Sequence, residues 1–228
     1  MSVDPLRHLS VFSPTAFGNR RVDIIGAGAT GSRIVLSLAK LGVENLHVWD
    51  FDKVEEHNVA NQAFGNGDIG KLKVEALAEL VKQQTGADIF IHPERVDGTQ
   101  TLGNVVFLLT DTMASRKEIW EKGLRYKFQV SLVVETRMGA DSMRVYAINP
   151  SDPSHIREWE KTLCADDVAE VSACGASITV GPTAETLSGL AVWQFIRWFS
   201  VFLGKKDDVL EHEIIMALRP SVLLTRRF

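Results

Sequence analysis

Three glycines in the first quarter of the chain have a spacing that can bind a nucleotide phosphate. Gly26, Gly28 and Gly31 form a G-x-G-x-x-G pattern between the β-rich run Val22 to Ile25 and an amphipathic segment. In such a turn the first glycine allows the bend, the second lets the backbone approach a phosphate, and the third lets the helix pack against the strand. The N–H groups at the helix N-terminus then attract the anion.

A carboxylate follows at the distance expected for a ribose contact. Asp50 ends the next predicted strand, about 20 residues after Gly31, where a carboxylate can accept a hydrogen bond from a ribose hydroxyl. A glycine-rich turn that only packs is the structural alternative. The pattern predicts a nucleotide without choosing among nucleotides, and on the glycines alone NAD is the default.

The residues after Asp50 change that choice. The segment from Asp50 to Gln62 reads D-F-D-K-V-E-E-H-N-V-A-N-Q, and it is followed by G-D-I-G-K-L-K at residues 67–73 and T-D-T-M-A-S-R at residues 110–116. This set resembles the ThiF/MoeB/HesA family of adenylating enzymes, relatives of the ubiquitin-activating enzymes. The family shows D-x-D-x-V-x-x-S-N-L-N-R-Q, V-G-x-x-K and T-D-N-x-x-x-R. The resemblance is continuous over residues 21–116 and weaker over the remainder.

The resemblance implies the chemistry of a ThiF-type adenylyltransferase, with ATP and Mg²⁺. Adenylation joins a carboxylate to the α-phosphate of ATP and expels pyrophosphate, so cations must stand where negative charge develops. By resemblance, Asp50 holds the ribose, Asn58 lies near the phosphates and Lys73 binds them. Asp111 falls on the family's magnesium ligand. Asp52 is a second acid near the site, without an assigned role.

Each of these residues also has a structural interpretation. Lys73 could be a solvated lysine on an amphipathic helix, and Asp111 could be the N-cap of the helix that follows it. Asn58 and Asp52 could be turn residues. Arg116 is expected to be structural rather than catalytic.

The chain departs from the family at one phosphate-binding position. The triplet N-R-Q is Ala-Asn-Gln here, so Asn61 replaces the arginine, and an amide cannot supply its positive charge. The family also uses an arginine from the N-terminal arm, often reaching into the partner subunit. Arg7, Arg20 and Arg21 are candidates for that role, and Arg137 is a candidate to lie near the site.

Neither the cysteines nor the histidines form a metal-binding pattern. There are two cysteines and no C-x-x-C pair, unlike many relatives that carry two zinc-binding pairs. Cys174, just before an apolar segment, is a candidate by position for a covalent intermediate, and Cys164 lies in a charged connection. An inert thiol is the alternative for both. His57 takes the place of the family's serine and is expected to be a surface or turn residue.

Strands alternate with helices through the first part of the chain, which predicts an α/β, Rossmann-like fold. We expect a mostly parallel sheet with helices on both faces and antiparallel strands added in the C-terminal part. We expect residues 1–20 to be an irregular N-terminal arm, residues 21–228 a single ThiF-like domain, and residues 149–171 a long connection. Predicted strands span residues 22–25, 46–49, 89–91, 104–109, 129–134, 143–148, 213–218 and 222–227. Predicted helices span residues 33–41, 72–84, 114–122 and 187–203.

Composition excludes several functional classes. The 228 residues carry a formal net charge of -4, which gives no basic face for nucleic acid. Residues 187–203 are very apolar, but Gln194 and Arg197 near the middle favour a buried helix over a membrane span. We expect no membrane partner, a cytoplasmic location with free thiols, and a homodimer that covers part of this helix.

Three functions remain open from the sequence. The first is ATP-dependent adenylation of a carboxylate, the C-terminus of a small ubiquitin-like or sulfur-carrier protein or of a peptide. The second is a degenerate nucleotide-binding interaction subunit without activation chemistry, which Asn61 supports. The third is an NAD-dependent oxidoreductase on the same fold, which would leave Lys73 and Asp111 without an essential role.

Overall fold

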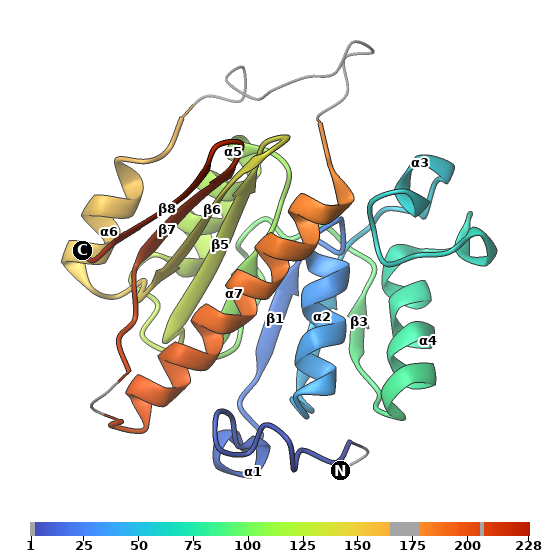
Figure 1. The fold of residues 1–228 in the computed structure, drawn as a ribbon, viewed down its shortest axis with the longest axis horizontal. Helices are drawn as coiled ribbons and strands as arrows, with labels where there is room; N and C mark the ends of the chain where they lie inside the picture. Colours follow the sequence, from blue (N-terminus) through green and yellow to red (C-terminus); the bar gives the residue numbers. More distant parts are fainter. Residues whose placement is uncertain (1–2, 165–177, 206–207) are drawn as a thin grey trace.

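The computed structural model describes residues 3–164, 178–205 and 208–228. Its centre is an eight-stranded sheet in the order β3-β2-β1-β4-β5-β6-β7-β8 (Figure 1). The pairs from β3 through β5 are parallel, and the pairs from β5 through β8 are antiparallel. The strands are β1 (Val22–Ile25), β2 (Leu46–Trp49), β3 (Phe90–His92), β4 (Val105–Leu108), β5 (Leu132–Met138), β6 (Ser142–Ile148), β7 (Glu213–Leu218) and β8 (Ser221–Arg226).

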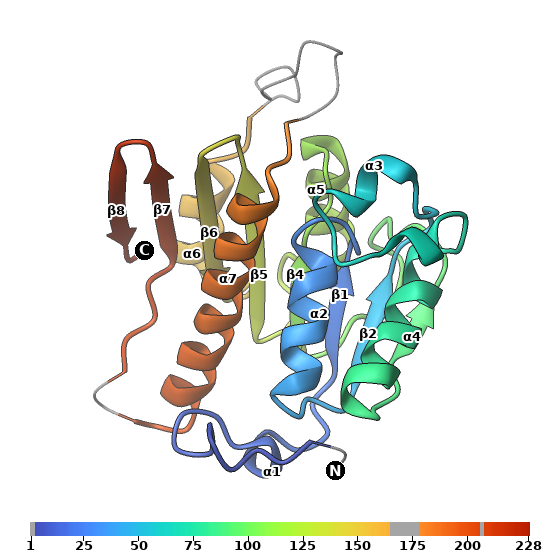
Figure 2. The ribbon, with the colours of Figure 1, turned by 45° about the vertical axis from the view of Figure 1, so that its right-hand side comes forward.

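Helices cover both faces of this sheet (Figure 2). One core cluster joins α2, α4 and α7 to one face, and a second cluster joins α5, α6 and the π-helical segment η2 to the other. The predicted α/β, Rossmann-like fold is therefore confirmed, including the antiparallel C-terminal strands. The helices are α1 (Pro14–Phe17), α2 (Gly31–Lys40), α3 (Glu56–Val59), η1 (Asn66–Asp68), α4 (Lys73–Thr85), α5 (Met113–Ile119), η2 (Trp120–Leu124), α6 (Pro153–Glu160) and α7 (Gly181–Phe202).

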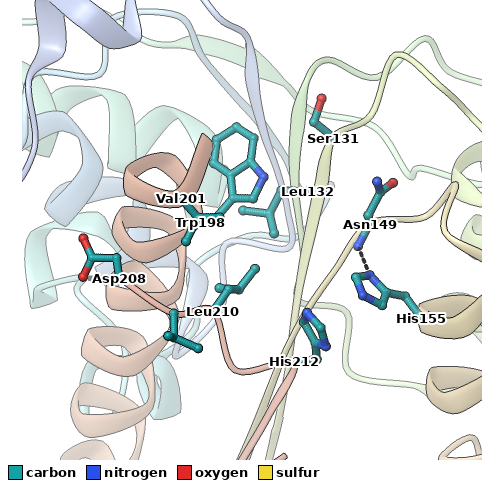
Figure 3. Close-up of a pocket in the computed structure, with 10 residues that line it drawn as sticks. Ser131, Leu132, Asn149, His155, Trp198, Val201, Asp208, Leu210 and His212 are labelled. Atoms are coloured by element: carbon teal, nitrogen blue, oxygen red, sulfur yellow. Dashed lines mark hydrogen bonds between the residues drawn. The ribbon is translucent and has the colours of Figure 1, made fainter. Parts of the chain in front are cut away.

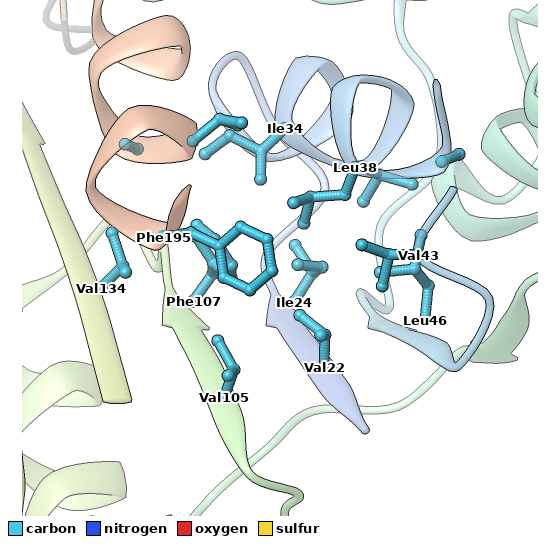
Figure 4. Packing of buried hydrophobic residues seen from close by; sticks show 14 of the residues in the cluster. Val22, Ile24, Ile34, Leu38, Val43, Leu46, Val105, Phe107, Val134 and Phe195 are labelled. Carbon is cyan, nitrogen blue, oxygen red and sulfur yellow. The ribbon is translucent and has the colours of Figure 1, made fainter. Parts of the chain in front are cut away.

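The central strands are buried on both sides. All four residues of β4 are fully buried, and they alternate between the two core clusters: Val105 and Phe107 face α2 and α7, whereas Val106 and Leu108 face α5 and α6. Figure 4 shows Phe107 and its neighbours packed against Ile34, Leu38 and Phe195. This two-sided burial explains why the sequence of β4 is continuously apolar.

The amino end of the sheet is closed by the N-terminal residues. Phe12 and Phe17 are buried against Phe195 and Phe199 of α7, with ring centroids 5.2 to 5.4 Å apart. The expectation of an irregular arm is wrong for α1, where Ser13 caps the helix and Pro14 is its first residue. Within the part of the chain that the structure describes, no helix has the length and hydropathy of a membrane span, α7 included.

The connection expected over residues 149–171 contains a helix instead. In α6, Asp152 caps the N-terminus by accepting hydrogen bonds from the backbone N–H groups of Ser154 and His155. Pro153 is the first helical residue, so the sequence Asp152-Pro153 is a helix-start signal. The charged composition of the segment led to its prediction as a connection. Trp159 of α6 is fully buried against the sheet, whereas residues 165–171 lie outside the described residues.

A pocket of about 420 Å³ opens at the amino end of β5, far from the glycine-rich turn (Figure 3). The rings of His155 and His212 contact each other there at a tilt of 52°, with centroids 4.0 Å apart. The Nδ1 atom of each ring accepts a backbone hydrogen bond, from Asn149 and Phe228 respectively. Each neutral ring therefore carries its proton on Nε2 and has no lone pair there for a metal ion. Burial lowers the pKa of His212 to about 4, and the neighbouring His155 adds to that shift.

This depressed pKa predicts acid sensitivity. Between pH 6.5 and about pH 4, His212 is protonated in the unfolded chain but neutral in the folded chain. The contribution of His212 to the free energy of unfolding should therefore fall from pH 6.5 towards pH 4 and then level off. Since the ring is half-buried, we expect a loss of about 1 to 2 kcal/mol over that window. Urea unfolding at pH 7.0, 5.5 and 4.5 should give a shallower pH dependence for His212→Asn.

The exposed His57 offers the control, because His57→Asn should follow the native curve. Equal pH slopes for the native chain and His212→Asn would show that His212 does not contribute to acid sensitivity.

Candidate functional site

The three glycines of the turn have three different environments. Gly26 has a φ of +103°, and a Cβ there would lie 2.8 Å from the carbonyl oxygen of Leu109. A Cβ on Gly31 would lie 1.9 Å from the carbonyl oxygen of Gly26. Among the described residues, no atom lies within 4 Å of a Cβ placed on Gly28. The bend and the close packing therefore require Gly26 and Gly31, whereas Gly28 leaves an open space.

This open space fits a phosphate group. It lies where α2 begins, and Thr30 at the N-cap makes no side-chain capping bond to the first turn of the helix. Backbone donors and the helix dipole favour an anion at such an N-terminus. The residues present thus suit the nucleotide that the sequence predicts.

Asp50 is tied directly to this turn. Its Oδ2 accepts a 2.7 Å hydrogen bond from the backbone N–H of Ala27, and its Oδ1 accepts a 2.8 Å bond from that of Asp52. Burial raises the pKa of Asp50, while Lys73 and the two N–H donors act in the opposite direction. The carboxylate is held in position at the end of β2, beside the glycines.

Lys73 and Asp52 form an ion pair next to Asp50. The Lys73 Nζ lies 2.7 Å from Asp52 Oδ2, and Lys73 is only 8% exposed. The backbone N–H of Lys73 also donates to the carbonyl of Asp52. The interpretation of Lys73 as a solvated lysine is therefore wrong, and Asp52 acquires a defined role as its partner. A buried lysine is stabilised only when it is paired in this way.

Asn58 is buried and supports the local backbone. It is 4% exposed, and its Oδ1 accepts a 2.9 Å hydrogen bond from the N–H of Glu55 at the start of α3. The side-chain oxygen of Asn58 therefore stabilises the local backbone, as the interpretation of Asn58 as a turn residue predicts. The neighbouring His57 has an exposed side chain 3.4 Å from a carboxylate oxygen of Glu55, as expected of a surface histidine.

Asp111 is exposed near the same end of the sheet. Its segment lies beside the turn because the N–H of Leu109 donates to the carbonyl of Ile25, the residue before Gly26. The N-cap of α5 is Thr112, which accepts from Ser115, so the N-cap interpretation of Asp111 is wrong.

A magnesium ion at Asp111 would need other ligands. Among the described residues, no three His, Cys, Asp or Glu side chains form a group that could hold a metal ion. Mg²⁺ commonly uses one or two carboxylates plus phosphate oxygens and water, which suits a single aspartate beside a phosphate-binding turn.

Arg116 and Arg137 are both committed to a buried carboxylate. Glu135 of β5 is fully buried and accepts hydrogen bonds from Arg116 and Arg137. Arg116 also donates to the carbonyl of Thr110, which fixes the segment that carries Asp111. Arg116 is structural, as expected, and Arg137 is held by Glu135 and by its bonds to Thr162.

The arginines of the N-terminal segment lie at the other end of the sheet. Arg20 donates to the carbonyls of Ala16 and Phe17, and Arg21 pairs with Asp23 at 2.7 Å. Both precede β1, whereas the glycine-rich turn follows it. Arg7 lies in the same exposed N-terminal segment. Within one chain these residues do not join the site.

The structure describes one of the two cysteines. Cys164 is partly buried, and its carbonyl accepts a 3.0 Å hydrogen bond from the Nζ of Lys117. Cys174 lies outside the described residues. The suggested covalent role of either thiol stays a prediction.

Comparison with known proteins identifies the class to which this fold and site belong. The chain matches the model of the ThiF family over residues 14–218, and it belongs to that family. It is 33% identical over 105 residues to the NEDD8-activating enzyme E1 catalytic subunit of Arabidopsis thaliana, covering 43% of this chain and 23% of that protein. It is 28% identical over 199 residues to the probable adenylyltransferase/sulfurtransferase MoeZ of Mycobacterium tuberculosis, covering 75% and 50%.

Solved structures support the fold. A structure of E. coli MccB with AMPCPP and MccA superposes with a TM-score of 0.72 at 14% identity, covering 97% of this chain and 69% of MccB. PaaA gives a TM-score of 0.67 at 17% identity, covering 91% and 64%. The curated relatives are longer: the matches to the NEDD8-activating enzyme of Arabidopsis thaliana and to MoeZ span 23% and 50% of their lengths.

The open space at Gly28 gives a test of the site itself. Gly28→Ala adds a methyl group where no protein atom lies, so the melting temperature should stay within about 2 °C of the native value. The same methyl group should obstruct a phosphate and weaken nucleotide binding by about tenfold or more. Calorimetric titration and thermal melting measure the two effects.

Gly31→Ala is the matched comparison, because its methyl group would clash with the backbone of Gly26. It should lower the melting temperature markedly. Unchanged nucleotide affinity in a folded Gly28→Ala protein would place the nucleotide elsewhere.

Proposed function

We propose that this chain adenylates a carboxylate with ATP, and that the carboxylate is the C-terminus of a small ubiquitin-like or sulfur-carrier protein or of a peptide. The observation that carries this proposal is the buried Lys73, which forms an ion pair with the half-exposed carboxylate of Asp52 beside Asp50; Asp50 is itself hydrogen-bonded to the glycine-rich turn. A dinucleotide site requires the turn and Asp50 but gives no reason to bury a lysine beside them.

The proposed reaction forms an acyl adenylate. A carboxylate oxygen of the substrate attacks the α-phosphorus of ATP, the bond from that phosphorus to the bridging oxygen breaks, and pyrophosphate leaves with the electron pair. The turn and the N-terminus of α2 bind phosphate oxygens, Asp50 accepts from the ribose, and Lys73 stabilises the developing negative charge. Magnesium, held in part by Asp111, would neutralise further phosphate charge.

The relatives support the substrate class. They include an enzyme named as NEDD8-activating and others named as adenylyltransferase and sulfurtransferase, MOCS3 and MoeZ. Structures of MccB carry ATP, AMPCPP and MccA. We extend from these proteins to this chain the use of ATP and a protein or peptide carboxylate.

Removing the Lys73 charge should separate adenylation from the alternatives. Lys73→Met should weaken Mg·ATP binding by about tenfold or more, because one buried charge-assisted contact to phosphate is lost. Lys71→Met is the control, since Lys71 pairs with Asp68 and Glu79 outside the cluster. Calorimetric titration with Mg·ATP and with NAD gives the affinities.

Three results would reject the proposal. Binding of NAD but not ATP favours the oxidoreductase, and binding of neither removes nucleotide chemistry from this chain. Tight ATP binding without ATP–pyrophosphate exchange, across a panel of carrier proteins and peptides, favours the degenerate subunit.

Asp111→Ala should reduce the exchange rate more than ATP affinity if Asp111 holds the metal during reaction.

We also propose that two copies pair through α7. Trp193, Val201 and Phe202 of this helix are 52%, 42% and 53% exposed, and Gly189, one turn before Trp193, leaves room beside it. Light scattering at micromolar concentration should give a dimer, and Trp193→Glu should give a monomer that is still folded by circular dichroism. Phe90→Glu, at an exposed residue of the edge strand β3, is the control. A native monomer at that concentration would refute the pairing.

A further inference from the structure

An arginine that the sequence motifs do not include lies beside the position of the lost family arginine. Arg33 is in the first turn of α2, and its side chain is 17% exposed. Its Nη1 donates to the carbonyl of Ala29 at 2.8 Å and to the carbonyl of Asn61 at 2.6 Å. One guanidinium therefore contacts both the glycine-rich turn and the residue that replaces the family arginine.

The direction of the Arg33 side chain places its charge at the phosphate end of α2. Side chains on a helix lean towards its N-terminus, and the contact with Ala29, between Gly28 and Gly31, shows that Arg33 does so. The N-terminus of α7 is also close to the guanidinium, because a Cβ on Gly181 would be 4.0 Å from Nη2. Arg33 thus lies close to two helix N-termini.

Among the described residues, no buried acid neutralises the charge of Arg33. Two of its contacts are with neutral carbonyls, and its carboxylate partner, Glu185, lies 3.5 Å away with a side chain that is 68% exposed. An exposed ion pair at that distance is weak. By contrast, Arg116 and Arg137 both hydrogen-bond to the fully buried Glu135.

We propose that Arg33 contacts the nucleotide phosphates and supplies, from within α2, the positive charge that Asn61 cannot supply. The inference rests on the proposed use of ATP. Arg33 contacts the backbone carbonyl of residue 61, which is the position that carries the arginine in the family's motif. Its guanidinium is therefore close to the segment from which the family arginine would come.

Variants that separate charge from hydrogen bonding test the proposal. Arg33→Lys keeps the charge, whereas Arg33→Gln keeps an N–H donor for the carbonyls and loses the charge. Affinity for Mg·ATP should fall by about tenfold or more in Arg33→Gln and clearly less in Arg33→Lys, while affinity for adenosine, measured by competition, stays within about twofold. Adding Asn61→Arg to Arg33→Gln should restore most of the ATP affinity.

Arg20→Gln is the matched control, because Arg20 also donates to two backbone carbonyls but lies at the opposite end of the sheet. Arg20→Gln should change neither the affinity for Mg·ATP nor the affinity for adenosine. The inference is overturned if Arg33→Gln binds ATP like the native chain, or if it loses ATP and adenosine equally. If Lys73→Met weakens ATP binding while Arg33→Gln does not, the proposed use of ATP is retained and only the proposed role of Arg33 is rejected. A native chain that binds no ATP overturns both.

Discussion

The hydrogen bond from the backbone N–H of Ala27 to the carboxylate of Asp50 is the contact on which the site depends. It joins the turn after β1 to the end of β2, at 2.7 Å, and burial makes an unmade bond there costly. The other oxygen of Asp50 accepts from Asp52, whose side chain holds Lys73. The glycine-rich turn, Asp50 and Lys73, which we propose contact the phosphates and the ribose, are thus linked through one carboxylate.

Charge balance explains why the same region needs more than one cation. Asp50 and Asp52 are neighbouring carboxylates, since Asp50 accepts a hydrogen bond from the backbone N–H of Asp52, and Lys73 forms an ion pair with Asp52. A triphosphate adds several more negative charges, which a single lysine already paired to an acid cannot offset. Arg33, whose close contacts are carbonyls and whose carboxylate partner Glu185 is exposed, is the cation that we propose for this role, and Mg²⁺ near Asp111 would supply the remainder.

Much of the fold and part of the site follow from the sequence, for identifiable reasons. The strand Val105–Leu108 is recognisable because burial on both faces leaves a continuous apolar run, and Gly26 and Gly31 because the backbone leaves no room for a Cβ. The helix α6 is missed because its capping signal, Asp152 and Pro153, lies in a charged context. The burial of Lys73 is also missed, since its partner Asp52 is distant in sequence and only the fold brings them together.

The position of Arg33 in the site could likewise not be predicted from the sequence. By sequence it is a polar residue on an amphipathic helix, and its relation to Asn61 exists only because the segment after α3 packs across the first turn of α2. The amino end of the sheet, filled by Phe12 and Phe17, holds Arg20 away from the turn. Positive charge for the phosphates must therefore come from residues that the fold already places at the carboxyl end, from a partner subunit, or from metal. Of these three sources, Arg33 is the one that the described residues of a single chain offer, because it already contacts both the glycine-rich turn and the backbone of Asn61.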